Sequence, residues 1–268
     1  NGDVLAAGDF DSTDGLPLAR VGRWKTSTEL WESLGNGISH GTPYAIASVG
    51  GGTVVVGGLS LSVEPYRYYG ILDWDGVNEK WLPAFSGTAG SIRAMDMTSD
   101  GKLVVGGNIK PYGQTSTECV AIHDDGIGTF QVLGTCTGGT VSTIEAVEGG
   151  DVLVGGTFTA INGVAFNRIA IFRASSGRWE PLGSGVNGGV TSINTGVTSV
   201  YVIRPGEYLV GGDFLQAGGI AAALMFPQFF LIWDNWRVAV GPLLGFGDLL
   251  YWLSWPSFWT HWLAGCWL

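Results

Sequence analysis

The chain has 268 residues, of which 46% are hydrophobic and 13% charged, and its formal net charge at pH 7 is −10. It is long enough to bury a sizeable core, as one large all-β domain or as two ordinary domains. Its 13 lysines and arginines form no cationic cluster of the kind that displaces counterions from phosphates. The charge therefore argues against a nucleic-acid partner and an anionic membrane surface, and it fits a soluble extracellular protein.

Glycine is unusually frequent, with 45 residues. The glycines follow no Gly-X-Y period, which excludes collagen, and they stand between apolar, β-branched runs. This pattern is typical of tight turns between many short strands. The first strand is expected almost at once, at residues 4–7. Because the sequence opens on Asn1 without a signal-peptide pattern, we expect a processed chain or part of a longer one.

Further strands are expected wherever a continuous apolar run ends in a pair of small residues. Such runs occupy residues 53–56, 103–105, 152–154 and 208–210. A run that is apolar at every position predicts burial on both faces. We therefore expect inner strands held between neighbouring sheets, with the glycine pairs allowing the backbones to approach closely.

Two markers divide the chain into repeats. The small-residue marker falls at Gly8, Gly58, Gly107, Gly156 and Gly212, in steps of 50, 49, 49 and 56. The aromatic marker, which follows a short turn, falls at Trp31, Trp81, Phe130, Trp179 and Trp236, in steps of 50, 49, 49 and 57. A further position lies seven residues before the aromatic marker in four copies, at Trp24, Trp74, His123 and Phe172. A Leu-Gly pair follows the marker at 34–35, 133–134 and 182–183, where the second copy has Ala84-Phe85.

Each repeat offers about four short apolar segments and no capped amphipathic helix. Repeats of roughly 40 to 50 residues with four strands are typical of propeller blades. We therefore predict an all-β fold: a β-propeller of about five four-stranded blades over residues 1–240, with a period of 49–50 residues and an irregular last repeat.

The repeats also resemble known families. The glycine pair, the apolar strand after it and the tryptophan after a short turn resemble kelch-type propellers. Residues 154–164 (VGGTFTAINGV), 167–170 (NRIA) and 179–188 (WEPLGSGVNG) are closer still to delta-sixty-repeat propellers, such as the propeller part of fungal cortical polarity markers. This resemblance covers residues 1–240. It implies large secreted or surface proteins in which the propeller binds or spaces, and it carries no catalytic residues.

The C-terminal segment, residues 241–268, departs from the repeat, and residues 249–268 contain no charged side chain. Three interpretations stay open. The segment could be a membrane-spanning anchor, which Pro256 and His261 disfavour. It could be a closing strand with a docking surface for another chain, or its stated sequence could be in error. On the docking interpretation, the candidate interface residues are Trp252, Trp255, Trp259, Trp262 and Trp267.

Acidic and glycine-rich motifs give little catalytic signal. Residues 9–15 resemble a calcium loop, but the third aspartate is displaced and the twelfth position is Arg20, so a polar loop is the simpler expectation. Residues 73–76 and 123–126 place acids and one histidine at repeated short turns, where Asp-Gly is ordinary turn chemistry. The stretches 50–52 and 188–189 lack the helix that a phosphate-binding loop needs.

The histidines, His40, His123 and His261, lie in no nucleophile or metal motif. The sequence therefore predicts no catalytic residue, no metal site and no cofactor. Pairs of carboxylates that meet only in space stay open, as in glycosidases.

Three cysteines are too few for a disulfide framework. Cys119 and Cys136 flank an expected hairpin, which brings their sulfurs within bridging range; a disulfide and two free thiols both fit the sequence. The corresponding positions in the next repeat are Arg168 and Gly185, so the pair is no requirement of the repeat. A bond between them would indicate an oxidising compartment.

We therefore expect a non-enzymatic extracellular or cell-surface module that binds other protein chains, copies of itself among them, with glycan binding open. The rival hypothesis is a glycan hydrolase or lyase with acidic residues converging on the propeller axis.

Overall fold

The computed structural model describes residues 2–13, 15–50, 53–63, 66–67, 70–84, 88–111, 117–124, 129–187, 197–204, 207–212, 214, 216–218, 220–221 and 228–232. Over these ranges the chain is all-β, as predicted, with one helical element, the 3₁₀ turn η1 (Glu148–Gly150). Within them no helix is long and apolar enough to cross a membrane. Residues 241–268, with the five candidate interface tryptophans, lie outside the described part.

Antiparallel groups of strands follow one another along the chain, and we call them units 1 to 5; units 2 and 3 are joined into one sheet by a single bridge between Leu59 and Ser91. Unit 1 consists of β1 (Val4–Ala7), β4 (Val21–Lys25) and β5 (Leu30–Ser33). Unit 2 has β6 (His40–Gly50), β7 (Thr53–Val63), β9 (Ile71–Asp75) and β10 (Lys80–Pro83). Unit 3 has β11 (Thr88–Met97), β12 (Leu103–Pro111), β13 (Glu118–Asp124) and β14 (Thr129–Gly134). Unit 4 has β16 (Val141–Ala146), β17 (Val152–Gly156), β20 (Ile169–Arg173) and β21 (Arg178–Pro181). Unit 5 has β23 (Val197–Arg204), β24 (Glu207–Gly212) and β27 (Gln228–Ile232).

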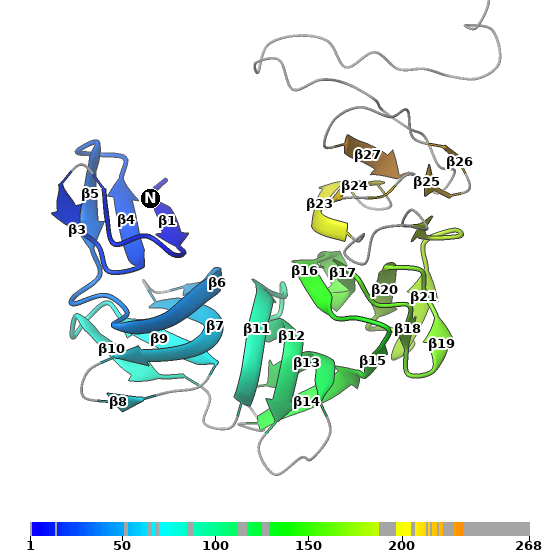
Figure 1. Cartoon of the computed structure of the whole chain (residues 1–268), viewed down its shortest axis with the longest axis horizontal. Coiled ribbons are helices and arrows are strands. Elements are labelled where there is room, and N and C mark those ends of the chain that lie inside the picture. Colours follow the sequence, from blue (N-terminus) through cyan, green and yellow to red (C-terminus); the bar gives the residue numbers. More distant parts are fainter. Residues whose placement is uncertain are drawn as a thin grey trace, which may run out of the picture.

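The units are arranged along an open arc, with units 1 and 5 at its two ends (Figure 1). In units 2 to 4 the four strands lie in chain order, and their first strands line the inner side of the arc. Strand β1 pairs with β4, and unit 5 forms a sheet of its own. The described strand pairing therefore does not close the sheets into a ring.

The order of strands corrects one part of the sequence interpretation. In units 2 to 5 the apolar run ending in glycines is the second strand, and another strand precedes it. That first strand carries two apolar residues three apart with a bulge between them, as at Val141 and Ile144 in β16. Because the bulge interrupts the alternation of the strand, its sequence shows no period of two.

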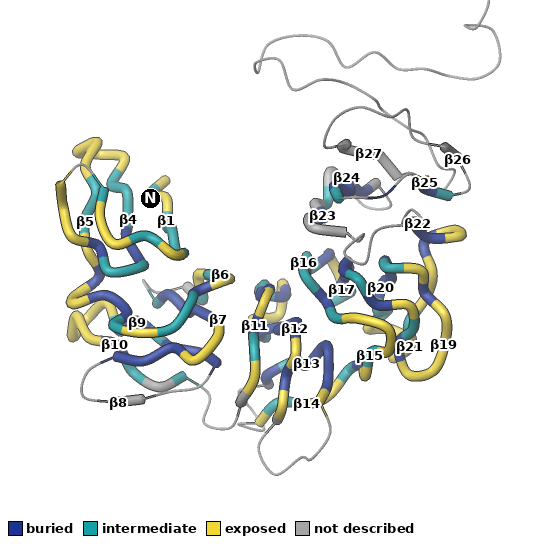
Figure 2. The backbone as a smooth tube through the Cα atoms, viewed as in Figure 1, coloured by how far each residue is buried: buried dark blue, intermediate teal, exposed yellow. Residues whose placement is uncertain are grey.

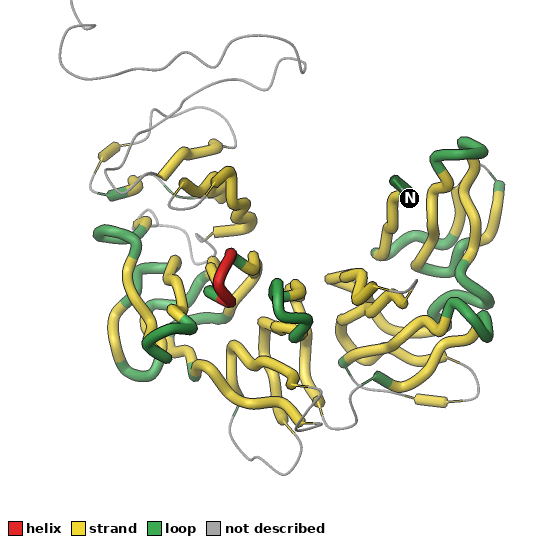
Figure 3. Tube along the Cα trace, turned by 180° about the vertical axis from the view of Figure 1, so that it is seen from behind, coloured by secondary structure: helices red, strands yellow, loops and turns green. Residues whose placement is uncertain are grey.

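Short hairpins follow the glycine pairs, and the sequence interpretation treated them as extended turns. In unit 4 the hairpin of β18 (Ala160–Ile161) and β19 (Val164–Ala165) pairs with β15 (Cys136–Thr137), in the link from unit 3. The other short strands are β2 (Ser12–Thr13), β3 (Leu16–Pro17), β8 (Tyr66–Arg67), β22 (Val186–Asn187), β25 (Gln216–Ala217) and β26 (Ile220–Ala221). The hairpin of β25 and β26 pairs in the same way with β22, in the link from unit 4, whereas β2 and β3 pair with each other and β8 pairs with β7. Figure 3 shows the strands and loops of the chain from behind.

The core is divided among the junctions between units. In β7, Val54 and Val56 pack in a cluster with unit 1, whereas Val55 packs in a cluster with unit 3. Strands β12 and β17 alternate in the same way, and each of the four junctions has its own apolar cluster. The continuous apolar runs are buried (Figure 2). They are buried on both faces, as predicted, because the pleat directs successive side chains to opposite neighbours.

The two glycines after each run have different roles. A Cβ added to Gly106 would lie 2.6 Å from Ile144 Cδ1 in the next unit, so this glycine permits close packing between sheets. A Cβ on Gly156 would lie 2.1 Å from the carbonyl oxygen of Thr140, which precedes β16, so the second glycine makes room for the bulged first strand.

Candidate functional site

The aromatic markers form pairs across two strands. In each of units 1 to 4, the residue seven positions before the marker lies directly opposite it. The ring centroids are 5.7 Å apart for Trp24–Trp31, 5.3 Å for Trp74–Trp81, 5.1 Å for His123–Phe130 and 5.4 Å for Phe172–Trp179. The seven-residue spacing is therefore the signature of a cross-strand aromatic pair.

The tryptophan of this pair also bonds to the preceding unit. Trp81 Nε1 donates to the carbonyl oxygen of Leu34 at 2.9 Å, and Trp179 Nε1 donates to that of Leu133 at 2.9 Å. Both acceptors belong to a Leu-Gly pair. Unit 3 departs on both sides of its junction, since its marker Phe130 has no N–H on the ring and the leucine position before it is Ala84. The two sequence markers are thus donor and acceptor of one contact, which we call the tryptophan latch.

We expect Trp81→Phe to lower the free energy of unfolding by about 1 kcal/mol, because it removes the buried hydrogen bond from Trp81 Nε1 to the carbonyl of Leu34, which then keeps only the N–H of Gly37. The matched control is Trp31→Phe, because Trp31 Nε1 has no acceptor among the described residues. Urea unfolding of both variants measures the difference. Equal losses would show that ring size, and not the latch, sets the effect.

A second contact joins the links after units 1 and 4 to the sheet before them. Arg20 Nη1 donates to the carbonyl oxygens of Ile38 and Ser39 at 3.1 Å, and Arg168 Nη1 donates to that of Val186 at 3.3 Å. The two arginines hold the same repeat position, just before β4 in unit 1 and β20 in unit 4, and both have φ 71°. We call this contact the arginine clamp.

Unit 3 has a disulfide where the clamp would be. Cys119 and Cys136 are bonded, with their Cα atoms 5.5 Å apart. Cys119 stands at the arginine position, and Cys136 stands at the position that Gly37 and Gly185 hold in the links after units 1 and 4. The sequence indicated that the cysteine pair is no requirement of the repeat. The structure adds that the disulfide joins the link to its sheet at the place where the arginine clamp does so in units 1 and 4.

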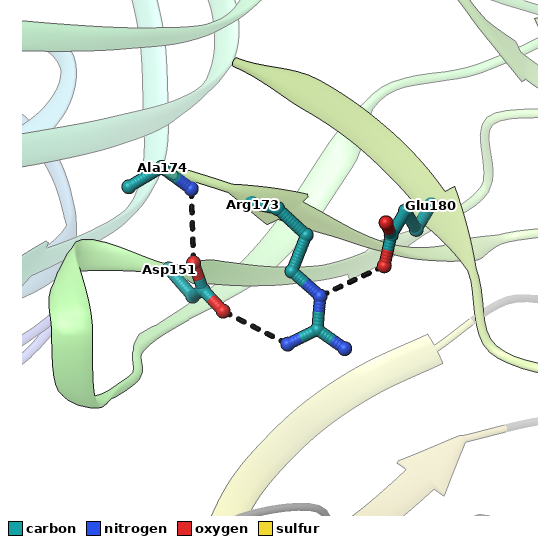
Figure 4. Close-up of polar contacts among 4 residues, drawn as sticks. All are labelled: Asp151, Arg173, Ala174 and Glu180. Carbon is teal, nitrogen blue, oxygen red and sulfur yellow. Dashed lines mark hydrogen bonds and ion pairs between the residues drawn. The ribbon is translucent and has the colours of Figure 1, made fainter. Parts of the chain in front are cut away.

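Unit 4 carries a network of charged side chains on its surface (Figure 4). Arg173 binds Asp151 through Nη1 at 2.8 Å and Glu180 through Nε at 2.9 Å, and Asp151 accepts the backbone N–H of Ala174 at 2.9 Å. The hydrogen bond that Arg173 donates to Asp151 is the main cause that raises the pKa of Arg173. The charged groups of this network are therefore paired with one another, and the network joins the turn before β17 to strands β20 and β21.

Two carboxylates meet on the inner strands. Asp96 of β11 accepts the N–H of Ala146 in β16 at 2.6 Å, and Glu145 is the residue before. Burial raises the pKa of the Glu145 carboxyl, and the charge of Asp96 raises it further. The two acids hold the same position in successive repeats, which the sequence did not single out because they share no motif. The hydrogen bond from Ala146 to Asp96 therefore joins unit 4 to unit 3, and it lies next to Glu145, whose pKa is raised.

Asp73, one of the turn acids considered from the sequence, lies on β9 with its Oδ1 atom buried and without a hydrogen-bond partner in the described part. Burial raises the pKa of Asp73, and Asp75 raises it further. Unit 1 has Arg23 at this position, and units 3 and 4 have Ile122 and Ile171. Asp73 is therefore the acidic residue at a position that holds a cation or an apolar side chain in these units.

We expect Asp73→Asn to raise the free energy of unfolding by about 1 kcal/mol at pH 7, because a buried unpaired charge is removed. A raised folded-state pKa stabilises the fold most below the ordinary value of 3.8 and loses that contribution as pH rises through the folded-state pKa. The advantage of the variant should thus disappear below about pH 3.8, as unfolding at several pH values would show. Asp75→Asn is the control, and it should lower the free energy of unfolding at pH 7, because hydrogen bonds from Asn78 and Val77 lower the pKa of Asp75. A gain in stability of Asp73→Asn that does not depend on pH would contradict the assignment.

The other candidate site residues considered from the sequence make contacts within the fold. Asp9 and Asp11 of the calcium-like loop face Arg20, each at 3.9 Å from its guanidinium, and Asp14 lies outside the described residues. Asp75 accepts the N–H groups of Val77 and Asn78, as expected of a turn. His123 is buried against its cross-strand aromatic partner. Within the described ranges, no group of three or more His, Cys, Asp or Glu side chains could hold a metal ion.

A shallow pocket of about 160 Å³ lies beside the arginine clamp of unit 4. Its polar side chains bond to one another or to the backbone: Asn187 Nδ2 donates to Gln216 Oε1 at 2.6 Å, and Asn167 Nδ2 donates to the carbonyl of Ser184 at 2.8 Å. The pocket is therefore part of the junction between units 4 and 5.

The first unit exposes the face that other units bury. Val4 is 56% exposed, whereas Val54 and Val152, at the same repeat position, are 6% and 0% exposed. Trp24 and Trp31 are half-buried, whereas Trp74 and Trp81 are buried. Unit 1 thus ends the arc with an apolar sheet face that repeats the interior junctions, and we call it the open face.

No protein-family model and no curated protein matches the sequence. Among solved structures, the chain is similar to two crystal structures of the extracellular domain of BT4673 from B. thetaiotaomicron, one described as a hybrid two-component system and the other as a one-component system. They share 13% and 12% identity with it, at TM-scores of 0.48 and 0.47, over 74% of this chain and 24% of each of those chains. The chain therefore spans about a quarter of the length of these structures. The resemblance to kelch-type and delta-sixty-repeat propellers stays a prediction.

Proposed function

We propose that the chain is a propeller-type binding and assembly module of kelch-like character, which docks other protein chains, copies of itself among them, and is not an enzyme. The observation that carries the proposal is the open face of unit 1. A large apolar sheet face is ordinarily an interface. Val4 and Trp31 repeat positions that are buried at the junction between units 1 and 2, so the same kind of surface is offered outward.

The propeller architecture is part of this proposal. Three units have four strands in chain order, each unit packs its sheet against the next, and the chain curves as an arc. Latches and clamps recur at equivalent positions, which supports one geometric operation repeated along the chain. We propose that the arc is part of a ring completed by further units.

We also propose an extracellular or cell-surface location. The disulfide between Cys119 and Cys136 supports an oxidising compartment, because such bonds persist there and are rare in the cytosol. The net charge of −10 supports a soluble surface that repels nucleic acid and anionic lipid.

Analytical ultracentrifugation of the full chain over a range of concentrations tests the assembly function. We expect concentration-dependent association that Val4→Lys weakens, because a lysine at an exposed position of the open face must be desolvated on docking. A chain without residues 241–268 tests the docking interpretation of the tryptophan-rich segment, and we expect it to be a soluble monomer. A monomeric full chain, or association unchanged in both variants, would overturn the proposal for self-assembly.

One observation favours the rival hypothesis of a glycan hydrolase or lyase. Asp96 and Glu145 lie on adjacent inner strands, and the raised pKa of Glu145 suits a general acid. A panel of sugar polymers incubated with the native chain and with Glu145→Gln decides between the two. Turnover abolished by this variant would establish the enzyme, whereas binding without turnover supports the module.

A further inference from the structure

The junction between units 2 and 3 carries an exposed patch at the bulges of its two first strands. Arg93 of β11 lies over the ring of Tyr44 in β6, with its guanidinium carbon 5.8 Å from the ring centroid. Leu59 of β7 pairs with Ser91, two residues before Arg93. It also pairs with Thr42, two residues before Tyr44. Tyr44 and Leu59 are each 44% exposed and Arg93 is exposed as well, and we call these three residues the bulge patch.

The repeat does not require these side chains, since Arg93, Asn108 and Ser142 hold the corresponding positions at the junction between units 3 and 4. Exposed tyrosine and arginine side chains often carry the binding energy of protein interfaces. A guanidinium that stacks on a ring uses its face and leaves its N–H groups free in the plane. Among the described residues no carboxylate forms a salt bridge with Arg93, so the bulge patch is prepared for a carboxylate from outside.

The turn between β9 and β10 of unit 2 carries the complementary groups. Val77 in this turn is 87% exposed, and Glu79 is exposed. Glu79 makes no salt bridge with any other side chain that the structure describes. Asp75 accepts the N–H groups of Val77 and Asn78 at 3.0 Å each, which fixes the turn before any partner binds.

The apolar residue of this turn is particular to unit 2. Units 1 and 4 have Ser27 and Ser175 at the position of Val77. The β9–β10 turn therefore presents an aliphatic side chain beside a free carboxylate. These are the groups that Leu59 and Arg93 of the bulge patch would bind, one by apolar contact and the other by charge-assisted hydrogen bonds.

The β9–β10 turn and the bulge patch lie toward opposite ends of one sheet. Trp74, just before the turn, pairs with Val54 near the start of β7, whereas Leu59 lies beyond the glycine pair of the same strand. Because the sheet holds these two ends apart, the turn of one copy can reach the bulge patch only of another copy. A contact between two different surfaces is heterologous, and it continues from copy to copy as an open row.

We propose that the β9–β10 turn of one copy of this chain binds the bulge patch of a second copy, with Glu79 against Arg93 and Val77 against Leu59. The inference rests on the proposed assembly function and adds a second contact to it. Docking on the open face joins copies into pairs. Each pair then presents two turns and two bulge patches, so pairs link to one another more tightly than single copies do, and the product is a row of pairs.

Charge reversal followed by analytical ultracentrifugation tests the contact. The native full chain should form species larger than a pair. Glu79→Arg and Arg93→Glu should each stop at the pair, even at a protein concentration about tenfold higher, because like charges then meet across the contact. Glu29→Arg and Ser142→Glu are the matched controls, since they place the same charges at the same repeat positions of units 1 and 4, and they should form rows as the native chain does.

Restoring the charge pair separates this contact from general effects of the substitutions. The double variant Glu79→Arg/Arg93→Glu has opposite charges again and should form rows. A mixture of the two single variants in equal amounts should also form them, because the unchanged turn of one variant meets the unchanged patch of the other. Damage to the fold would not be repaired in either case.

Three results would overturn the inference and leave the assembly function standing: a native chain that stops at pairs, rows that persist in both reversals, or rows lost equally in the two control variants. Val4→Lys acts on the open face and should instead give single copies. A native chain that is monomeric at every concentration would contradict the assembly function itself, and the inference with it. The two failures therefore differ in the size of the species observed.

Discussion

Replacing both bridged cysteines, as in C119S/C136S, should lower the free energy of unfolding by about 3 kcal/mol, from the entropy of closing a loop of this size. The bond spans 17 residues and ties strand β13 to the link that pairs with the hairpin of unit 4. Because Cys119 also belongs to the apolar cluster between units 3 and 4, the loss should concentrate at that junction. Urea unfolding measures the total, and hydrogen exchange shows its location.

Reductant supplies the control for this prediction. Treating the native chain with dithiothreitol should reproduce the loss, and treating the double serine variant should change nothing further, although Cys266 is still present. A double variant as stable as the native chain would show that pairing of β15 with β18 holds the link without the bond.

Gly156→Ala should cost about 3 kcal/mol or more, one of the largest effects of any single methyl group in this chain. The new Cβ would lie 2.1 Å from the carbonyl oxygen of Thr140 and 2.9 Å from Val141 Cα, and both are backbone atoms that cannot rotate away. The bulge between β16 and β17 would have to open, and with it the packing of Val141.

Gly8→Ala is the matched control, since it is the same change at the same repeat position in unit 1, where an added Cβ would meet only the ring of Phe10 among the described residues. Thermal unfolding of the two variants should therefore separate widely. If both variants lost equal stability, the cause would be the conformational preference of the backbone and not the close approach of a first strand.

Much of the fold could be predicted from sequence because the residues that recur in the repeat are the ones that make contacts between neighbouring sheets. The Gly-Gly pairs, the aromatic pair seven residues apart and the Leu-Gly doublet all correspond to contacts at junctions between sheets. Burial of the apolar runs on both faces was correct for the same reason. Each of these signals is a side chain, or the absence of one, that a close neighbour requires.

The rest could not be predicted because its signal is in the backbone or in space. The first strands were missed because a bulge between residues such as Ile92 and Ala94 breaks their alternation. The arginine clamp donates to carbonyl oxygens, which every residue carries, so its acceptors leave no trace in the sequence. Asp96 and Glu145 come together through the stacking of two units and share no motif.

The alternation of buried side chains along β7, β12 and β17 has a consequence for how the chain unfolds. Successive apolar residues of one strand belong to two different clusters. Each cluster combines residues of two units, so the stability of a unit depends on its neighbours. Stability in such an array is a sum of couplings between adjacent members, as in a one-dimensional row of linked spins. Units 2 to 4, which have a neighbour on each side, should therefore unfold at a higher temperature than unit 1, and melting should travel inward from the terminus of the arc.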